Sequence, residues 1–227
     1  MSDFTKVDER IFSVHDHWID PDSREIWIHS VDVSGPGYEG EDPGVEYNMA
    51  IKVIKNLHYL RKKSSRARAT LHLHSVGGNW QEGMAIYDTI KLMPYPVTII
   101  SYTQAESMSS ILLQAAAGPY DTRLVMPHSY FMFHYGEIST SGGLSAVETE
   151  IEFSKTQKKE MIDIYVDAVD GSPKFKEKTP TQIKKYLENC MEKKGDVYLT
   201  SKETVEWGFA DGIVESWPNH TKWPKKK

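Results

Sequence analysis

A serine, a histidine and an aspartate, which together can cleave an amide bond, each occur in this chain at the end of a predicted strand or in a turn. Ser107 lies between an apolar run from Val97 to Tyr102, which predicts a strand, and residues 108–117, whose small and apolar side chains predict a helix. A serine at such a junction can direct its hydroxyl into a cleft, and the first helical turn offers backbone N–H groups to a developing oxyanion. The alternative is a serine that only caps the helix, and this segment alone favours the cap.

Two residues farther along the chain could serve as base and orienting group for that serine. His134 closes an aromatic run that predicts a strand, and Asp196 stands at a predicted turn before Val197. A general base beside a serine must be held by packed neighbours, and a carboxylate should orient it. Each residue also has an ordinary structural interpretation, since aspartates at turns commonly bond their own backbone.

A Gly-Gly pair offers a second source of backbone N–H groups. The run that starts at Thr70 predicts a strand ending in Gly77 and Gly78, and a helical pattern follows over residues 83–93. Glycines after a strand let N–H groups face a ligand, because no Cβ blocks the approach. The alternative is a plain turn, and no phosphate-loop or dinucleotide fingerprint surrounds the pair.

Taken in order, these segments resemble the proteolytic subunit of the Clp protease over about residues 24–216. Residues 83–90 are similar to the helix after that family's Gly-Gly turn, and residues 105–108 to its Ala-Ala-Ser-Met motif. Residues 132–134 match its Met-Ile-His, and residues 196–211 follow its aspartate-containing segment. The resemblance implies an α/β fold of the ClpP and crotonase type, with repeated ββα units in a spiral and a projecting handle helix.

Carried over by position, the resemblance assigns the chemistry. Ser107 would be the nucleophile, His134 the general base and then acid, and Asp196 the group that fixes the imidazole tautomer. Gly77 and Met108 would supply the two oxyanion N–H groups. The implied reaction is peptide-bond hydrolysis through an acyl-enzyme, and neither a metal nor an organic cofactor is expected.

The chain departs from the family pattern at several places. Val76 replaces the proline before the Gly-Gly pair, Glu106 puts a carboxylate beside the nucleophile, and residues 135–136 replace a Gln-Pro. We expect the Glu106 side chain to point away from the cleft, because side chains alternate along a strand. Extra loops are expected at residues 35–44 and 171–180.

The remaining elements follow from periodicity. Residues 25–29 predict the first strand, and a helix ending in the basic residues 61–63 is predicted by the apolar positions Met49, Val53, Leu57 and Leu60. This order of strands and helices predicts right-handed parallel βαβ units. A long charged helix is predicted over residues 144–169, with an apolar side that includes Val147, Ile151, Met161 and Tyr165.

We expect three regions along the chain: a mobile arm over residues 1–23, a peptidase domain over 24–216, and a basic tail over 217–227. In the Clp family, the region that matches residues 137–169 is a handle that joins two heptameric rings. A solvated helix lying on its own domain is the alternative. The long charged pattern favours the handle, because few apolar positions are left to bury.

Composition bounds the function. The chain has 227 residues, of which 39% are hydrophobic, and this is enough for one sizeable core. Its net charge of −5 gives no sign of nucleic-acid binding. Cys190 is the only cysteine, so an intrachain disulfide is excluded and a reducing compartment is favoured. No apolar run approaches the ~20 residues of a membrane helix.

His72 and His74 share one face of a strand, but a metal site needs more ligands, so we expect a structural role. A cytoplasmic protein without nucleic-acid or membrane partners is expected.

The expected function is therefore that of a ClpP-like serine endopeptidase. It would act as a homo-oligomer, with two stacked heptameric rings forming a tetradecamer that admits peptides or unfolded proteins. An AAA+ unfoldase partner is left open, because residues 1–23 do not resemble the family's hydrophobic axial loop. Three alternatives remain: a viral head-maturation protease of Clp type, a non-catalytic ring subunit, and a crotonase-type acyl-CoA enzyme, which would need no such triad.

Overall fold

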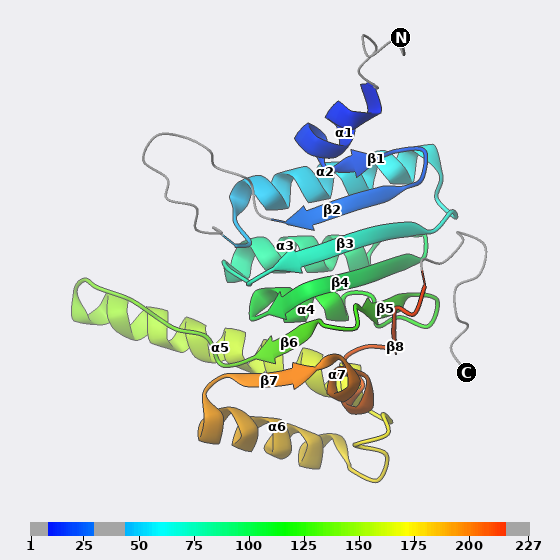
Figure 1. Ribbon diagram of the computed structural model, residues 1–227. Helices are drawn as coiled ribbons and strands as arrows, with labels where there is room; N and C mark the ends of the chain where they lie inside the picture. The colour runs from blue at the N-terminus through cyan, green and yellow to red at the C-terminus, as the bar shows by residue number, and fades with distance from the viewer. Residues whose placement is uncertain (1–8, 30–43, 217–227) are drawn as a thin grey trace.

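The computed structural model describes residues 9–29 and 44–216 (Figure 1). Within these residues the strands form one eight-stranded sheet in the order β1-β2-β3-β4-β5-β8, with β6 beside β4 and β7 beside β6. The strands are β1 (Ile19–Asp20), β2 (Glu25–His29), β3 (Ala69–Ser75), β4 (Val97–Glu106), β5 (Thr122–Val125), β6 (Tyr130–Phe133), β7 (Val197–Thr200) and β8 (Gly212–Ile213). The helices are α1 (Glu9–His17), α2 (Tyr47–Lys63), α3 (Trp80–Lys91), α4 (Met108–Gln114), α5 (Leu144–Val169), α6 (Pro180–Lys194) and α7 (Ser201–Trp207).

The sheet is mostly parallel. β2, β3, β4, β5 and β8 run in the same direction, and β6 runs parallel to the last part of β4. Only the β1–β2 and β6–β7 pairs are antiparallel among the described strands. β3 is buried at six of its seven positions, as is common for parallel strands. The predicted parallel α/β arrangement is confirmed.

Helices α2 and α3 lie behind the sheet in the view of Figure 1. Helix α2 starts at a cap in which the Glu46 carboxylate accepts the N–H groups of Asn48 and Met49. Its buried residues repeat at helical spacing, as the sequence predicts: Met49, Ala50, Val53, Leu57 and Leu60. Helix α3 begins at Trp80, earlier than predicted, because the Asn79 side chain accepts the N–H of Glu82 and caps the helix there.

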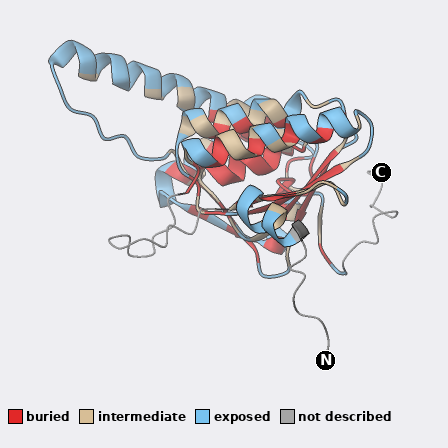
Figure 2. Ribbon diagram, turned by 90° about the horizontal axis from the view of Figure 1, so that it is seen from above, coloured by how far each residue is buried: buried red, intermediate tan, exposed pale blue. Residues whose placement is uncertain are grey.

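Helix α5 is anchored at one end only. Its buried residues, Met161, Ile162, Tyr165, Val166 and Val169, all lie in its last third. The first part of the helix projects from the body of the protein (Figures 1 and 2) and is largely exposed. Of the four apolar positions expected on one side, Met161 and Tyr165 join the core, whereas Ile151 stays 41% exposed. A projecting helix was predicted here, and the structure has one.

The expectation of a mobile arm over residues 1–23 is wrong for its second half. Residues 9–17 form α1, and Trp18 and Ile19 are buried, at 2% and 6% exposure. The Lys52 ammonium lies 4.2 Å from the centre of the Trp18 ring, and β1 pairs with β2. Two buried residues after a short exposed helix carry no periodic signal, which is why the sequence did not reveal this segment. Residues 1–8 lie outside the described residues.

The segment before α6 is also packed rather than a free loop. Phe175 is fully buried, and its ring meets that of Trp207 edge-on at 5.9 Å. Thr179 then caps α6 in a capping box with Gln182. The expected loop at 35–44, except for Gly44, and the basic tail at 217–227 lie outside the described residues. None of the helices that can be described is long and apolar enough to cross a membrane.

Candidate active site

Ser107 stands between β4 and α4 in a backbone conformation that non-glycine residues rarely adopt. Its φ is 50° and its ψ is −123°, outside the three regions usually allowed for L-residues. Its N–H donates to the Met132 carbonyl oxygen at 3.0 Å, which joins the turn to β6. The Ser107 side chain makes no capping hydrogen bond to α4. Instead, its Oγ lies 2.8 Å from His134 Nε2, so the geometry decides against the simple cap.

His134 and Asp196 meet because β6 and β7 are antiparallel neighbours. Phe133 is paired with Val197, so the residue after β6 lies beside the residue before β7. His134 Nδ1 is 3.0 Å from Asp196 Oδ1. With the proton on Nδ1, the imidazole donates to Asp196 and leaves Nε2 to accept from the Ser107 hydroxyl. The three residues predicted from the sequence are therefore brought together in the predicted order.

Gly77 lies against the peptide bond that follows Ser107. A Cβ at Gly77 would be 2.6 Å from Ser107 Cβ and 2.9 Å from Met108 N, and its φ of +103° strains any other residue. The Gly77 N–H donates to Ser75 Oγ at 3.3 Å. Met108 opens α4, so its N–H has no acceptor within the helix. Gly77 and Met108 therefore lie close together beside Ser107, with the Ser75 hydroxyl as the present acceptor of the Gly77 N–H.

Two backbone hydrogen bonds to Val45, which the sequence did not reveal, hold the Gly-Gly turn in place. The Val45 N–H donates to the Gly77 carbonyl at 2.5 Å, and the Asn79 N–H donates to the Val45 carbonyl at 2.8 Å. Val45 is 1% exposed. Backbone bridges of this kind leave no side-chain pattern, so sequence reasoning has no signal for them.

Glu106 is more exposed than Ala105, the residue before it. Ala105 before it is fully buried, whereas Glu106 is half-buried, in agreement with the alternation expected for a strand. Burial raises the pKa of the Glu106 carboxyl, a side-chain hydrogen bond with Gln104 partly offsets this, and the Asp196 carboxylate raises it further. Its electrostatic neighbours are thus Asp196 and His134, which the sequence did not place beside it.

A cleft of about 700 Å³ opens at Ser107 and His134. Its lining includes the nearly fully buried Met108, Ile111 and Met161 together with polar residues of the exposed part of α5. One of these, Lys158, places its ammonium 3.4 Å from the centre of the Tyr135 ring. Sequence reasoning missed the cleft residues of α5, although positions 151, 154, 155, 158 and 161 share the spacing of one helical face.

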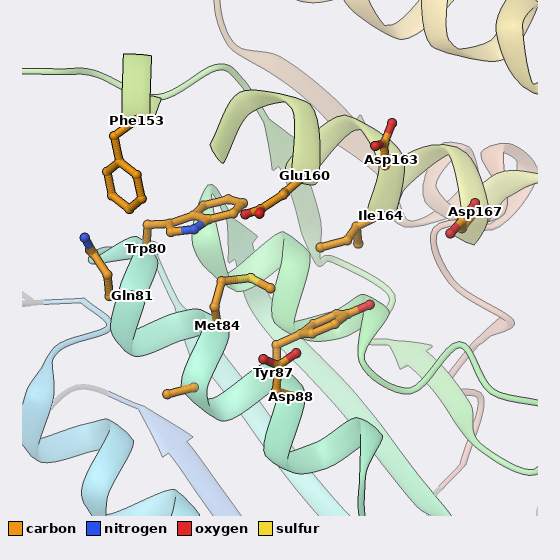
Figure 3. A pocket seen from close by; sticks show the side chains of 11 residues that line it. Trp80, Gln81, Met84, Tyr87, Asp88, Phe153, Glu160, Asp163, Ile164 and Asp167 are labelled. Carbon is orange, nitrogen blue, oxygen red and sulfur yellow. The ribbon is translucent and has the colours of Figure 1, made fainter. Parts of the chain in front are cut away.

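A second hollow, of about 680 Å³, lies between α3 and α5 (Figure 3). Trp80 lines both this hollow and the cleft at Ser107. Its lining combines aromatic and acidic side chains: Trp80, Tyr87, Phe153, Asp88, Glu160, Asp163 and Asp167. It contains none of the residues predicted to act in catalysis.

His72 and His74 do not share an environment. His72 is 7% exposed, its ring stacks on Trp27 at 5.0 Å, and its Nδ1 lies 3.0 Å from the Tyr102 hydroxyl. His74 is exposed. Over residues 9–29 and 44–216, no group of three or more His, Cys, Asp or Glu could hold a metal ion. The packing of His72 fits the structural role expected of it.

Comparison with known families identifies the family of this chain. The family model described as Clp protease matches residues 42–217, which is most of the chain. The matched range includes Gly77, Ser107, Met108, His134 and Asp196.

Proposed function

We propose that this chain, which belongs to the Clp protease family of serine endopeptidases, cleaves peptide bonds with Ser107, His134 and Asp196. The observation that carries the proposal is the continuous contact from Ser107 Oγ to His134 Nε2, at 2.8 Å, and from His134 Nδ1 to Asp196 Oδ1, at 3.0 Å. The strained conformation of Ser107 supports it, because a nucleophile on a sharp strand-to-helix turn exposes its Oγ.

The steps follow from this arrangement. His134 Nε2 takes the Ser107 proton as Oγ attacks the scissile carbonyl carbon, and Asp196 stabilises the imidazolium that forms. The N–H groups of Gly77 and Met108 donate to the resulting oxyanion. His134 then gives the proton to the leaving amine, which releases one product and leaves an acyl-enzyme on Ser107. Water, activated by the same imidazole, hydrolyses the acyl-enzyme.

The enzyme is further proposed to work inside a homo-oligomeric chamber of two stacked heptameric rings, on peptides or unfolded proteins. Support comes from α5, whose projecting part exposes Leu144, Ile151 and Phe153 at 75%, 41% and 48%. Ile151 and Phe153 line the two hollows beside α5 and still stay exposed in the single chain, which leaves apolar surface that a second subunit could cover. Light scattering at micromolar concentration should give the mass of an oligomer, and a monomeric mass would contradict the chamber.

The decisive experiment on the chemistry is Ser107→Ala, assayed with a fluorogenic peptide and a fluorophosphonate probe. We expect kcat to fall by about 10³-fold or more and labelling to disappear. Adding His134→Ala to Ser107→Ala should lower kcat little further, because triad members act as a unit. Ser109→Ala is the matched control, since Ser109 is buried in the first turn of α4 and its Oγ has no hydrogen-bond partner in the described structure.

Two results would overturn the proposal. One is a Ser107→Ala protein that hydrolyses peptides at the wild-type rate. The other is a wild-type protein that the probe does not label and that cleaves no peptide, which is the behaviour of a non-catalytic ring subunit.

A further inference from the structure

Tyr165 joins the anchored end of α5 to the turn that carries Ser107. Its side chain is fully buried, and its ring packs against Phe131, Phe133 and Phe209 with centroids at 6.4, 5.7 and 5.5 Å. Its hydroxyl lies 2.6 Å from Ser110 Oγ. Four packed rings leave Tyr165 little freedom, so the position of its hydroxyl is set by the core.

Ser110 passes this contact to the backbone of Ser107. Ser110 Oγ donates to the Ser107 carbonyl oxygen at 2.6 Å, and the Ser110 N–H donates to the same oxygen at 3.0 Å. A hydroxyl has one hydrogen, so Ser110 must accept from Tyr165. Burial raises the pKa of Tyr165 well above its ordinary value, which keeps this hydroxyl protonated at neutral pH. The hydrogen bonds therefore run in one direction, from Tyr165 to Ser110 to the carbonyl.

The carbonyl of Ser107 and the N–H of Met108 belong to one peptide group. A trans peptide is planar, so its C=O and N–H point in opposite directions. Holding the carbonyl against α4 therefore turns the Met108 N–H away from the helix. Hydrogen bonds in a chain also polarise one another, which makes that N–H a better donor.

We propose that Tyr165 is a positioning residue that acts through Ser110 to aim the Met108 N–H at the oxyanion. The inference rests on the proposed function, in which Ser107 is the nucleophile and Met108 donates to the tetrahedral intermediate. Because an oxyanion exists only after the attack, the effect belongs to the transition state and not to substrate binding.

A purely structural role predicts something different. A typical buried hydrogen bond contributes modestly to stability, and its loss should lower the melting temperature without changing kcat at a folded site. Tyr95 gives the matched control, since its side chain is 3% exposed and its hydroxyl donates to the Leu57 carbonyl at 2.9 Å, outside the cleft. Tyr95→Phe and Tyr165→Phe each remove one oxygen and one buried hydrogen bond.

The experiment measures peptide hydrolysis and the inhibition constant of a peptidyl boronate, whose tetrahedral adduct places an oxygen at the oxyanion position. For Tyr165→Phe we expect kcat to fall about tenfold with KM within twofold of wild type, less than the ~10²–10³-fold loss of an entire oxyanion donor. Boronate affinity should fall by the same factor. Ser110→Ala removes the bond to the Ser107 carbonyl itself, so it should lose at least as much as Tyr165→Phe, and the double variant should be no worse than Ser110→Ala. Tyr95→Phe should keep both constants.

The inference is overturned if Tyr165→Phe keeps the wild-type kcat and boronate affinity, if only KM changes, or if Tyr95→Phe loses as much activity. The Ser107→Ala result separates the two proposals. If Ser107→Ala is inactive while Tyr165→Phe is unimpaired, the triad stands and the positioning role fails. If Ser107→Ala is active, the proposed function fails, and with it the role of Met108 as an oxyanion donor.

Discussion

Gly77→Ala should inactivate the enzyme through one methyl group. The added Cβ would lie 2.6 Å from Ser107 Cβ, 2.8 Å from the Glu106 carbonyl oxygen and 2.9 Å from Met108 N. Carbon atoms in contact rest about 3.5–4.0 Å apart, so Gly77 and Ser107 must separate by roughly 1 Å. A misplacement of about 1 Å costs on the order of 10²-fold in rate. We therefore expect kcat/KM to fall about 100-fold or more.

The conformational cost of the substitution has to be separated from this collision. Gly77 has a φ of +103°, and a side chain in such a sparsely populated region costs about 1–3 kcal/mol. Gly171 is a suitable control, because its φ is +72° and nothing lies within 4 Å of the Cβ that alanine would add. Gly171→Ala should lose about as much stability as the positive φ costs in Gly77→Ala, and it should keep its activity.

The assay combines peptide hydrolysis, fluorophosphonate labelling and thermal unfolding of both variants. If Gly77→Ala retains kcat/KM within threefold of wild type, the close approach of this turn to Ser107 is not needed for catalysis. If Gly171→Ala loses activity as well, the loss reflects general destabilisation and the steric reasoning is refuted.

Two further predictions concern charged groups. Burial raises the folded-state pKa of Glu106, so the folded protein favours the protonated carboxyl and its stability falls as pH rises through that pKa. Glu106→Gln should therefore be more stable than wild type at pH 7. The gain should be less than about 1 kcal/mol, because the group is half-exposed. The gain should vanish near pH 3 in thermal melts, and a gain that persists in acid would contradict this reasoning. Arg123, 5% exposed, pairs with Asp211 at 2.9 Å, and Asp211→Ala should cost about 3–5 kcal/mol in urea unfolding because it leaves a buried charge. A cost below 1 kcal/mol would show that Gln114, 2.6 Å from the guanidinium, is a sufficient partner.

Periodic patterns predicted the elements that bury a regular face. Helix α2 follows from Met49, Val53, Leu57 and Leu60, all fully buried, and α5 has the bounds predicted for it, 144–169. The mostly parallel sheet followed from the alternation of strands and helices. Each of these inferences depends on many residues, so one unusual position does not alter it.

Features that depend on one contact were not predictable. Trp18 is buried by tertiary packing after a short exposed helix, which leaves no repeating signal. Ser107, His134 and Asp196 were predicted to act together because the motifs that carry them have a known order. The neighbours of Glu106 were not predicted, since β4, β6 and β7 have to be assembled first. The link between Tyr165 and Ser110 spans 55 positions, and nothing in either segment indicates it.

The strands that bring Ser107, His134 and Asp196 together also determine when the site can exist during synthesis. Asp196 follows Ser107 by about ninety residues, which a ribosome adds in roughly 4–18 s at about 5–20 residues per second. Until β7 is made and pairs with β6, the carboxylate is not in place beside His134. Under the proposed mechanism, the nascent chain would therefore lack the aspartate partner of His134 while most of it is being translated, which would limit cleavage of neighbouring polypeptides before folding is finished.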